Sequence, residues 1–84
     1  MILVDVRYDK LNFAYDCLVD ETLKVSEFIT ELSRFIPIDE DKVSVGAVSL
    51  CEELKQDETL SYQGILGGDT LVVYEKDKYV ICKG

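Results

Sequence analysis

Hydrophobic and polar residues alternate one by one near the start of the chain. Apolar or aromatic side chains occupy every second position of residues 2–8, and the alternation resumes over residues 12–19. A period of two residues is typical of a strand with one face toward a core. Asp9 and Lys10 interrupt the pattern. We therefore expect an N-terminal hairpin of two strands joined at this pair.

The period changes to that of an α-helix in the next part of the chain. Either Thr22 or Ser26 is suited to cap its start, and Pro37 ends it, because the residue before a proline avoids helical angles. Apolar residues recur there at intervals of three and four and predict one buried stripe. They are Val25, Phe28, Ile29, Leu32, Phe35 and Ile36.

A second, shorter pair of strands is predicted after the helix. Residues 42–45 form one strand, Gly46 and Ala47 turn, and residues 48–51 return as the other strand. In the polar loop that follows, we expect Leu54 to be the only buried residue.

Residues 59–74 predict how the domain closes. We expect a helical turn at 59–63 with Leu60 inward, a glycine corner at 67–69, and a last strand at 70–74. The order is then β-β-α-β-β-turn-β. It indicates an α+β fold, in which the first and last strands pair in parallel at the centre of a mixed sheet and the helix packs on one face.

Size and charge limit what the chain can bind. Its 84 residues suffice for one domain. Its net charge of −8 repels phosphate, so we expect no nucleic acid and no direct membrane insertion. Asp5 comes too early for a signal peptide, and no apolar run approaches the ~20 residues of a membrane span. Cys17, Cys51 and Cys82 form no CxxC pair, which predicts reduced thiols and a cytoplasmic protein.

Residues that usually carry catalysis are scarce. The chain has no histidine, which is the commonest general base and metal ligand. The run Asp39, Glu40 and Asp41 lacks the glycine turn of a calcium loop. The glycines of residues 64–68 do not form a phosphate-loop motif. We therefore expect no enzymatic activity, no cofactor and no metal.

The last strand supplies candidate binding residues. If Leu71 faces the core, Val72 and Tyr74 lie on the sheet face away from the helix. Alternation in the hairpin places Leu3 and Leu18 on that same face. An apolar cluster with an aromatic member on an open face is a candidate protein-binding patch.

Three local motifs accompany this order of elements. They are a second strand reading Tyr15-Asp16-Cys17-Leu18-Val19, a helix stripe of Val25, Phe28, Ile29 and Leu32, and an ending with Thr59-Leu60, Ile65 and Gly68-Asp69-Thr70-Leu71. With these motifs, residues 1–74 resemble the ubiquitin-like superfamily and are most similar to the bacterial EsaB/YukD family of type VII secretion accessory proteins. The resemblance implies a cytoplasmic, non-enzymatic β-grasp protein that binds other proteins, such as a membrane component of the secretion machine.

The resemblance also adds one residue to the candidate site. The partner-binding face of ubiquitin corresponds to Ser44, Val72 and Tyr74, although Ser44 replaces an apolar residue there. The candidate protein-binding residues are therefore Leu3, Leu18, Ser44, Val72 and Tyr74.

Residues 75–84 follow the predicted domain as a tail. The strand-like residues 79–82 either add a strand, pair with a neighbour in a homo-oligomer, or remain flexible. The tail ends in one glycine, Gly84, where conjugated modifiers expose two. A conjugated or sulfur-carrier modifier acting through Gly84 is an alternative function, and a small subunit of a multicomponent enzyme is another.

Overall fold

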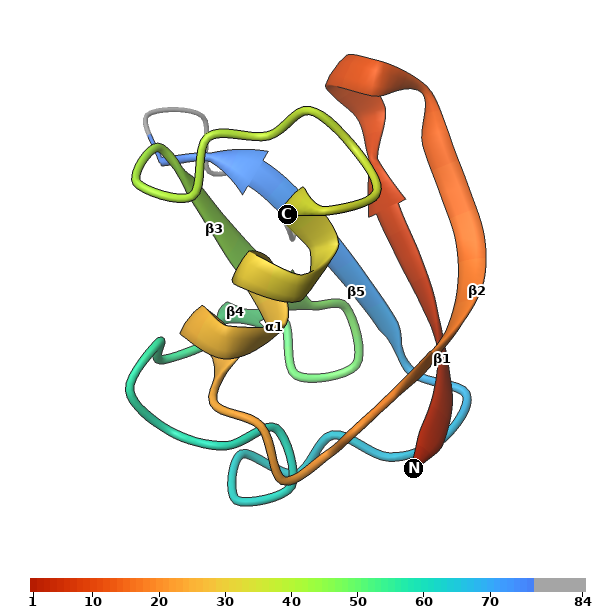
Figure 1. Cartoon of the computed structure of the whole chain (residues 1–84). Helices are drawn as coiled ribbons and strands as arrows, with labels where there is room; N and C mark the ends of the chain where they lie inside the picture. The colour runs from red at the N-terminus through yellow and green to blue at the C-terminus, as the bar shows by residue number, and fades with distance from the viewer. Residues whose placement is uncertain (77–84) are drawn as a thin grey trace.

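A five-stranded sheet with one α-helix across one of its faces forms the protein (Figure 1). The structure is a computed structural model, and it describes residues 1–76. The strand order is β2-β1-β5-β3-β4. The elements are β1 (Ile2–Tyr8), the 3₁₀ turn η1 (Asp9–Leu11), β2 (Phe13–Val19), α1 (Val25–Ser33), β3 (Val43–Ala47), β4 (Glu52–Glu53) and β5 (Thr70–Glu75).

The N-terminal hairpin forms as the alternation predicts. β1 and β2 pair antiparallel, from Ile2 opposite Val19 to Tyr8 opposite Phe13. The turn closes through Asn12, whose φ of 55° is left-handed and is tolerated by asparagine better than by most residues. β2 is an edge strand beyond the cover of the helix, so Tyr15 stays exposed although it lies on the core side.

The helix is shorter than the apolar stripe suggests. Lys24 precedes its first turn, and the Glu27 carboxylate accepts a hydrogen bond of 2.9 Å from the Lys24 backbone N–H. The predicted caps Thr22 and Ser26 are therefore wrong. The helix ends at Ser33, so the residues after it no longer follow the helical spacing that would turn them toward the core. Phe35 is 80% exposed as a result.

The predicted parallel pairing at the centre of the sheet is confirmed. β1 runs parallel to β5, with Val6 beside Leu71, and β3 pairs antiparallel on the other side of β5. The helix and the inner face of the sheet bury one continuous core. Its members include Val4, Val6, Tyr8, Val25, Phe28, Ile29, Leu32, Val43, Val45, Leu54, Leu60, Ile65, Leu71 and Val73.

The third strand and its return differ from the prediction. Gly46 and Ala47 are strand residues, because they pair with β5 on one side and with β4 on the other. The turn lies at residues 48–51, which were predicted as a strand, and Cys51 takes a left-handed φ of 58° there. The return strand is β4, so the predicted polar loop begins with two strand residues.

Two cysteines lie within the described part of the chain and are in different states. Cys17 is a free, half-buried thiol, whereas Cys51 is disulfide-bonded. The expectation that the thiols are all reduced is therefore corrected, and the cysteines do not support the cytoplasmic location expected from them. Cys82, Gly84 and the predicted strand at 79–82 lie outside the described residues.

Candidate functional site

The sheet face away from the helix carries the residues predicted to bind a partner. On β1, Leu3 alternates with the buried Val4 and therefore points away from the core. Leu18 of β2 is its direct cross-strand neighbour. Leu3 is 52% exposed and Leu18 is 62% exposed. The structure thus brings together the two leucines that the hairpin pattern predicts on this face.

An acidic pair lies next to the leucine pair. Asp5 stands opposite Asp16 in the same register, two residues after Leu3 on β1 and two residues before Leu18 on β2. Arg7 Nε donates a hydrogen bond of 2.9 Å to Asp5 Oδ2, so one carboxylate of the pair has a cationic partner. Within residues 1–76, no ion pair holds Asp16, which is exposed. We call Leu3, Leu18, Asp5 and Asp16 together the hairpin surface.

Val72 belongs to the same face but does not join the leucine pair. It is half-buried in β5, between Arg7 on one side and Gly46 on the other. A row of charged side chains in β1 and β2 therefore separates Val72 from Leu3 and Leu18. The predicted apolar cluster is divided in two.

Tyr74 and Ser44 are buried, which corrects their assignment as exposed contact residues. They are direct neighbours across β5 and β3, and they are 7% and 3% exposed. The Tyr74 hydroxyl donates a hydrogen bond of 2.6 Å to Glu53 Oε1. Ser44 Oγ accepts a hydrogen bond of 3.3 Å from Gln56 Nε2. These polar groups have partners within the protein, so Tyr74 does not serve as an exposed aromatic anchor.

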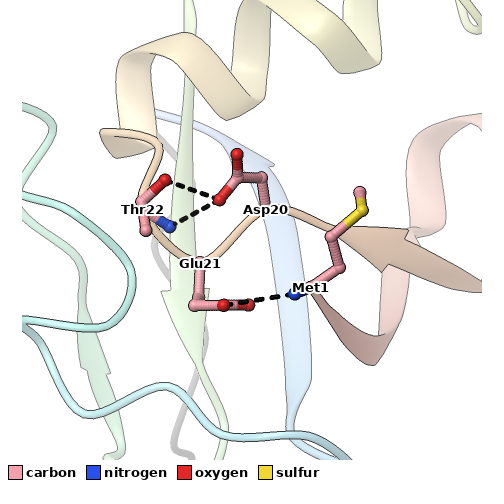
Figure 2. A network of polar contacts seen from close by, with 4 residues as sticks. All are labelled: Met1, Asp20, Glu21 and Thr22. Carbon is pink, nitrogen blue, oxygen red and sulfur yellow. Dashed lines mark hydrogen bonds and ion pairs between the residues drawn. The ribbon is translucent and has the colours of Figure 1, made fainter.

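The end of the hairpin that carries the leucines is held by a polar network (Figure 2). The N-terminal ammonium of Met1 lies 3.2 Å from Glu21 Oε1. Asp20 Oδ1 accepts hydrogen bonds from the hydroxyl and the backbone N–H of Thr22, at 2.6 and 2.9 Å. The side-chain bond first, and then the backbone bond, lower the pKa of Asp20. These contacts fix the connection between β2 and α1 beside the start of β1.

The loop before β5 also lies against this end of β1. The Gly68 N–H donates a hydrogen bond of 2.8 Å to the Leu3 carbonyl oxygen. Asp69 Oδ2 accepts one of 2.8 Å from the backbone N–H of Leu66 within the same loop. Leu66 is a large exposed apolar residue that is absent from the predicted site. Residues 65–66 lie outside any strand, so no periodic pattern signals the exposure of Leu66.

The other candidate sites to consider within the described residues are a metal site and a surface pocket. Among residues 1–76, no three Cys, Asp or Glu side chains converge in a way that could hold a metal ion. A surface pocket of about 220 Å³ includes Lys10 and Lys42 in its lining. Lys10 lies 3.1 Å from Glu75, and Lys42 lies 3.8 Å from Asp39, so both cations have carboxylate partners.

None of the helices within residues 1–76 has the length and apolar content that a membrane span requires.

Comparison with solved structures identifies the class of fold. The N-terminal ubiquitin-like domain of the 4931431F19Rik protein is 22% identical, with a TM-score of 0.75, and the match covers 99% of this chain and 82% of that one. Ubiquitin from Caldiarchaeum subterraneum is 17% identical, with a TM-score of 0.74, over 89% of this chain and 92% of that one. ATBAG1, solved in complex with HSP70, is 16% identical, with a TM-score of 0.74, over 89% of this chain.

The protein therefore has the ubiquitin-like β-grasp fold. This chain spans 40% of the ATBAG1 chain. The TM-scores of 0.74 to 0.75 show a shared fold, whereas identities of 16–22% leave the partner open. No protein-family model matches the chain, and no curated protein sequence matches it.

Proposed function

We propose that the protein is a non-enzymatic binding module that docks a protein partner on its hairpin surface. The observation that carries the proposal is the exposure of Leu3 and Leu18 as direct neighbours on a hydrogen-bonded sheet. Adjacent exposed apolar side chains on a rigid element favour a protein contact, because burial against a partner removes them from water without an ordering cost for the backbone. The centre of the site moves from Val72 and Tyr74, as predicted from sequence, to the leucine pair.

The proposed setting is a bacterial type VII secretion system, in which the protein acts as a cytoplasmic accessory or regulator. This part rests on the motifs at residues 15–19, in the helix stripe and at residues 68–71, which resemble the EsaB/YukD family. A complex with HSP70 is reported for ATBAG1, and 40% of the ATBAG1 chain matches this fold. The modifier alternative depends on Gly84, which lies outside the described residues, and it stays a prediction.

Co-purification from the native host tests the proposal. Leu18→Ser removes half of the leucine pair from an exposed position, so the fold should persist while the captured partner falls about tenfold. Phe35→Ser is the matched control, because Phe35 is a large exposed apolar residue that follows the helix on the opposite face of the sheet. Capture of secretion components by the wild type and by Phe35→Ser, but not by Leu18→Ser, is the expected result. Equal capture by all three proteins would refute the hairpin surface as the binding site.

A further inference from the structure

The hairpin surface combines two apolar side chains with two carboxylates in a fixed arrangement. Leu3 and Leu18 form one cross-strand row, and Asp5 and Asp16 form the next row on the same face. Residues two apart on a strand are separated by about 6.8 Å along it. An extended peptide has the same spacing between alternate side chains, so two of its side chains can meet both rows at once.

The acidic row is not neutralised within the described structure. Asp5 and Asp16 are like charges directly opposite each other, an arrangement that destabilises an antiparallel pair. Arg7 contacts Asp5 through Nε, whereas no ion pair within residues 1–76 holds Asp16, so one negative charge of the row remains uncompensated. The chain as a whole carries a net charge of −8, which attracts a cationic segment to the protein, and the acidic row adds negative charge on this face.

Resting on the proposed function, we infer that the hairpin surface binds an extended, basic segment of a protein partner. The segment places an apolar side chain on Leu3 and Leu18. It places an arginine or lysine, two positions away, between Asp5 and Asp16. Arginine fits best, because its planar guanidinium can bond two carboxylate oxygens at once.

Charge argues against the other occupants of this surface. A second copy of the chain docked through the same face would bring further aspartates against Asp5 and Asp16. A nucleic acid would bring phosphates to the same row. A partner segment with alternating apolar and basic side chains satisfies both rows.

Selection from a random twelve-residue peptide library against the full chain tests the inference. The enriched peptides are synthesised, and their affinities are measured for the wild type and for Leu18→Ser, Asp16→Asn and Asp41→Asn. Asp41→Asn is the charge-matched control. Asp41 is an exposed aspartate in the loop after the helix, so its substitution removes the same charge as Asp16→Asn. Circular dichroism confirms that each variant is folded.

We expect enriched peptides with Arg or Lys two positions from an apolar residue. Their binding should weaken about tenfold in Leu18→Ser and about fivefold in Asp16→Asn, while Asp41→Asn changes it by less than about twofold. Peptides that need Leu18 but lack basic residues, or that ignore Asp16→Asn, would overturn this inference and leave the proposed function intact. Enrichment that is independent of Leu18, or no enrichment at all, would overturn both.

Discussion

The two halves of the outer sheet face look alike in sequence and differ in structure. In the β1–β2 half, Leu3 and Leu18 oppose each other and are both more than half exposed. In the β5–β3 half, Tyr74 and Ser44 oppose each other in the same way and are both buried. Strand alternation places all four side chains on this face.

The difference shows that facing away from the core is not the same as facing solvent. Alternation determines the face on which a side chain lies, but the rest of the chain determines whether that face is covered. Tyr74 reaches Glu53 on β4, and Ser44 is bonded by Gln56 from the following loop. An aromatic residue with its hydroxyl bonded inside the fold contributes to stability, whereas an exposed leucine pair is available for binding.

Alanine substitutions at Tyr74 and Leu18 should give the largest difference in free energy of unfolding between the two halves of the outer face. Tyr74→Ala removes a buried aromatic ring and its bond to Glu53, so we expect the free energy of unfolding to fall by about 3 kcal/mol. Leu18→Ala changes an exposed side chain and should alter it by less than about 0.5 kcal/mol. Urea unfolding, followed by circular dichroism, measures both values. Equal losses in the two variants would contradict the division of the face.

Much of the fold could be predicted from the chain, because long periodic segments leave few alternatives. β1, β2 and β5 follow from alternation, and the core side of α1 follows from its stripe. The turn before β4 was misplaced, because glycine at position 46 signals a turn locally. In the fold, that glycine is a buried strand residue between Val72 and Glu53. Such pairing comes from residues far apart in sequence.

The candidate site was predicted only in its hairpin half for the same reason. Leu3 and Leu18 are exposed because β2 is an edge strand and nothing within residues 1–76 lies over that pair. The cover over Tyr74 involves a hydrogen bond to a residue 21 positions away. A period of two within one strand carries no information about such a partner.

Substitution at the glycine corner where the two halves join should lower the free energy of unfolding by less than Tyr74→Ala does. Gly68 donates its N–H to the Leu3 carbonyl and holds a φ of +92° just before β5 begins. A Cβ at Gly68 would meet nothing within 4 Å, so the cost of Gly68→Ala is conformational, and we expect a loss of about 1 kcal/mol.

Gly67→Ala is the control for the corner. A Cβ at Gly67 would lie 3.9 Å from the Leu3 carbonyl oxygen, an ordinary contact, and its φ is not left-handed. We expect a change within about 0.5 kcal/mol. Thermal melts of both variants under identical conditions test the pair. A larger loss of stability for Gly67→Ala than for Gly68→Ala would show that steric contact, rather than the backbone angle, determines which side chains the corner tolerates.

The smallest expected effect is on the reactivity of the Cys17 thiol. Cys17 lies on the core side of β2, opposite the buried Val4, and reports on the charges of the hairpin half. Burial first, and then the charges of Asp16 and Asp5, raise the pKa of its thiol. Less thiolate is therefore present at a given pH, and we expect iodoacetamide to alkylate Cys17 more slowly than it alkylates an unfolded peptide with the same sequence. Asp16→Asn removes one of the charges that raise the pKa, so it should speed the reaction, while Asp41→Asn should not. Mass mapping of the Cys17 peptide between pH 7 and 10, a range about the ordinary thiol pKa, gives the rates. An unchanged rate in Asp16→Asn would mean that burial alone protects the thiol and that the acidic row exerts little field at this strand.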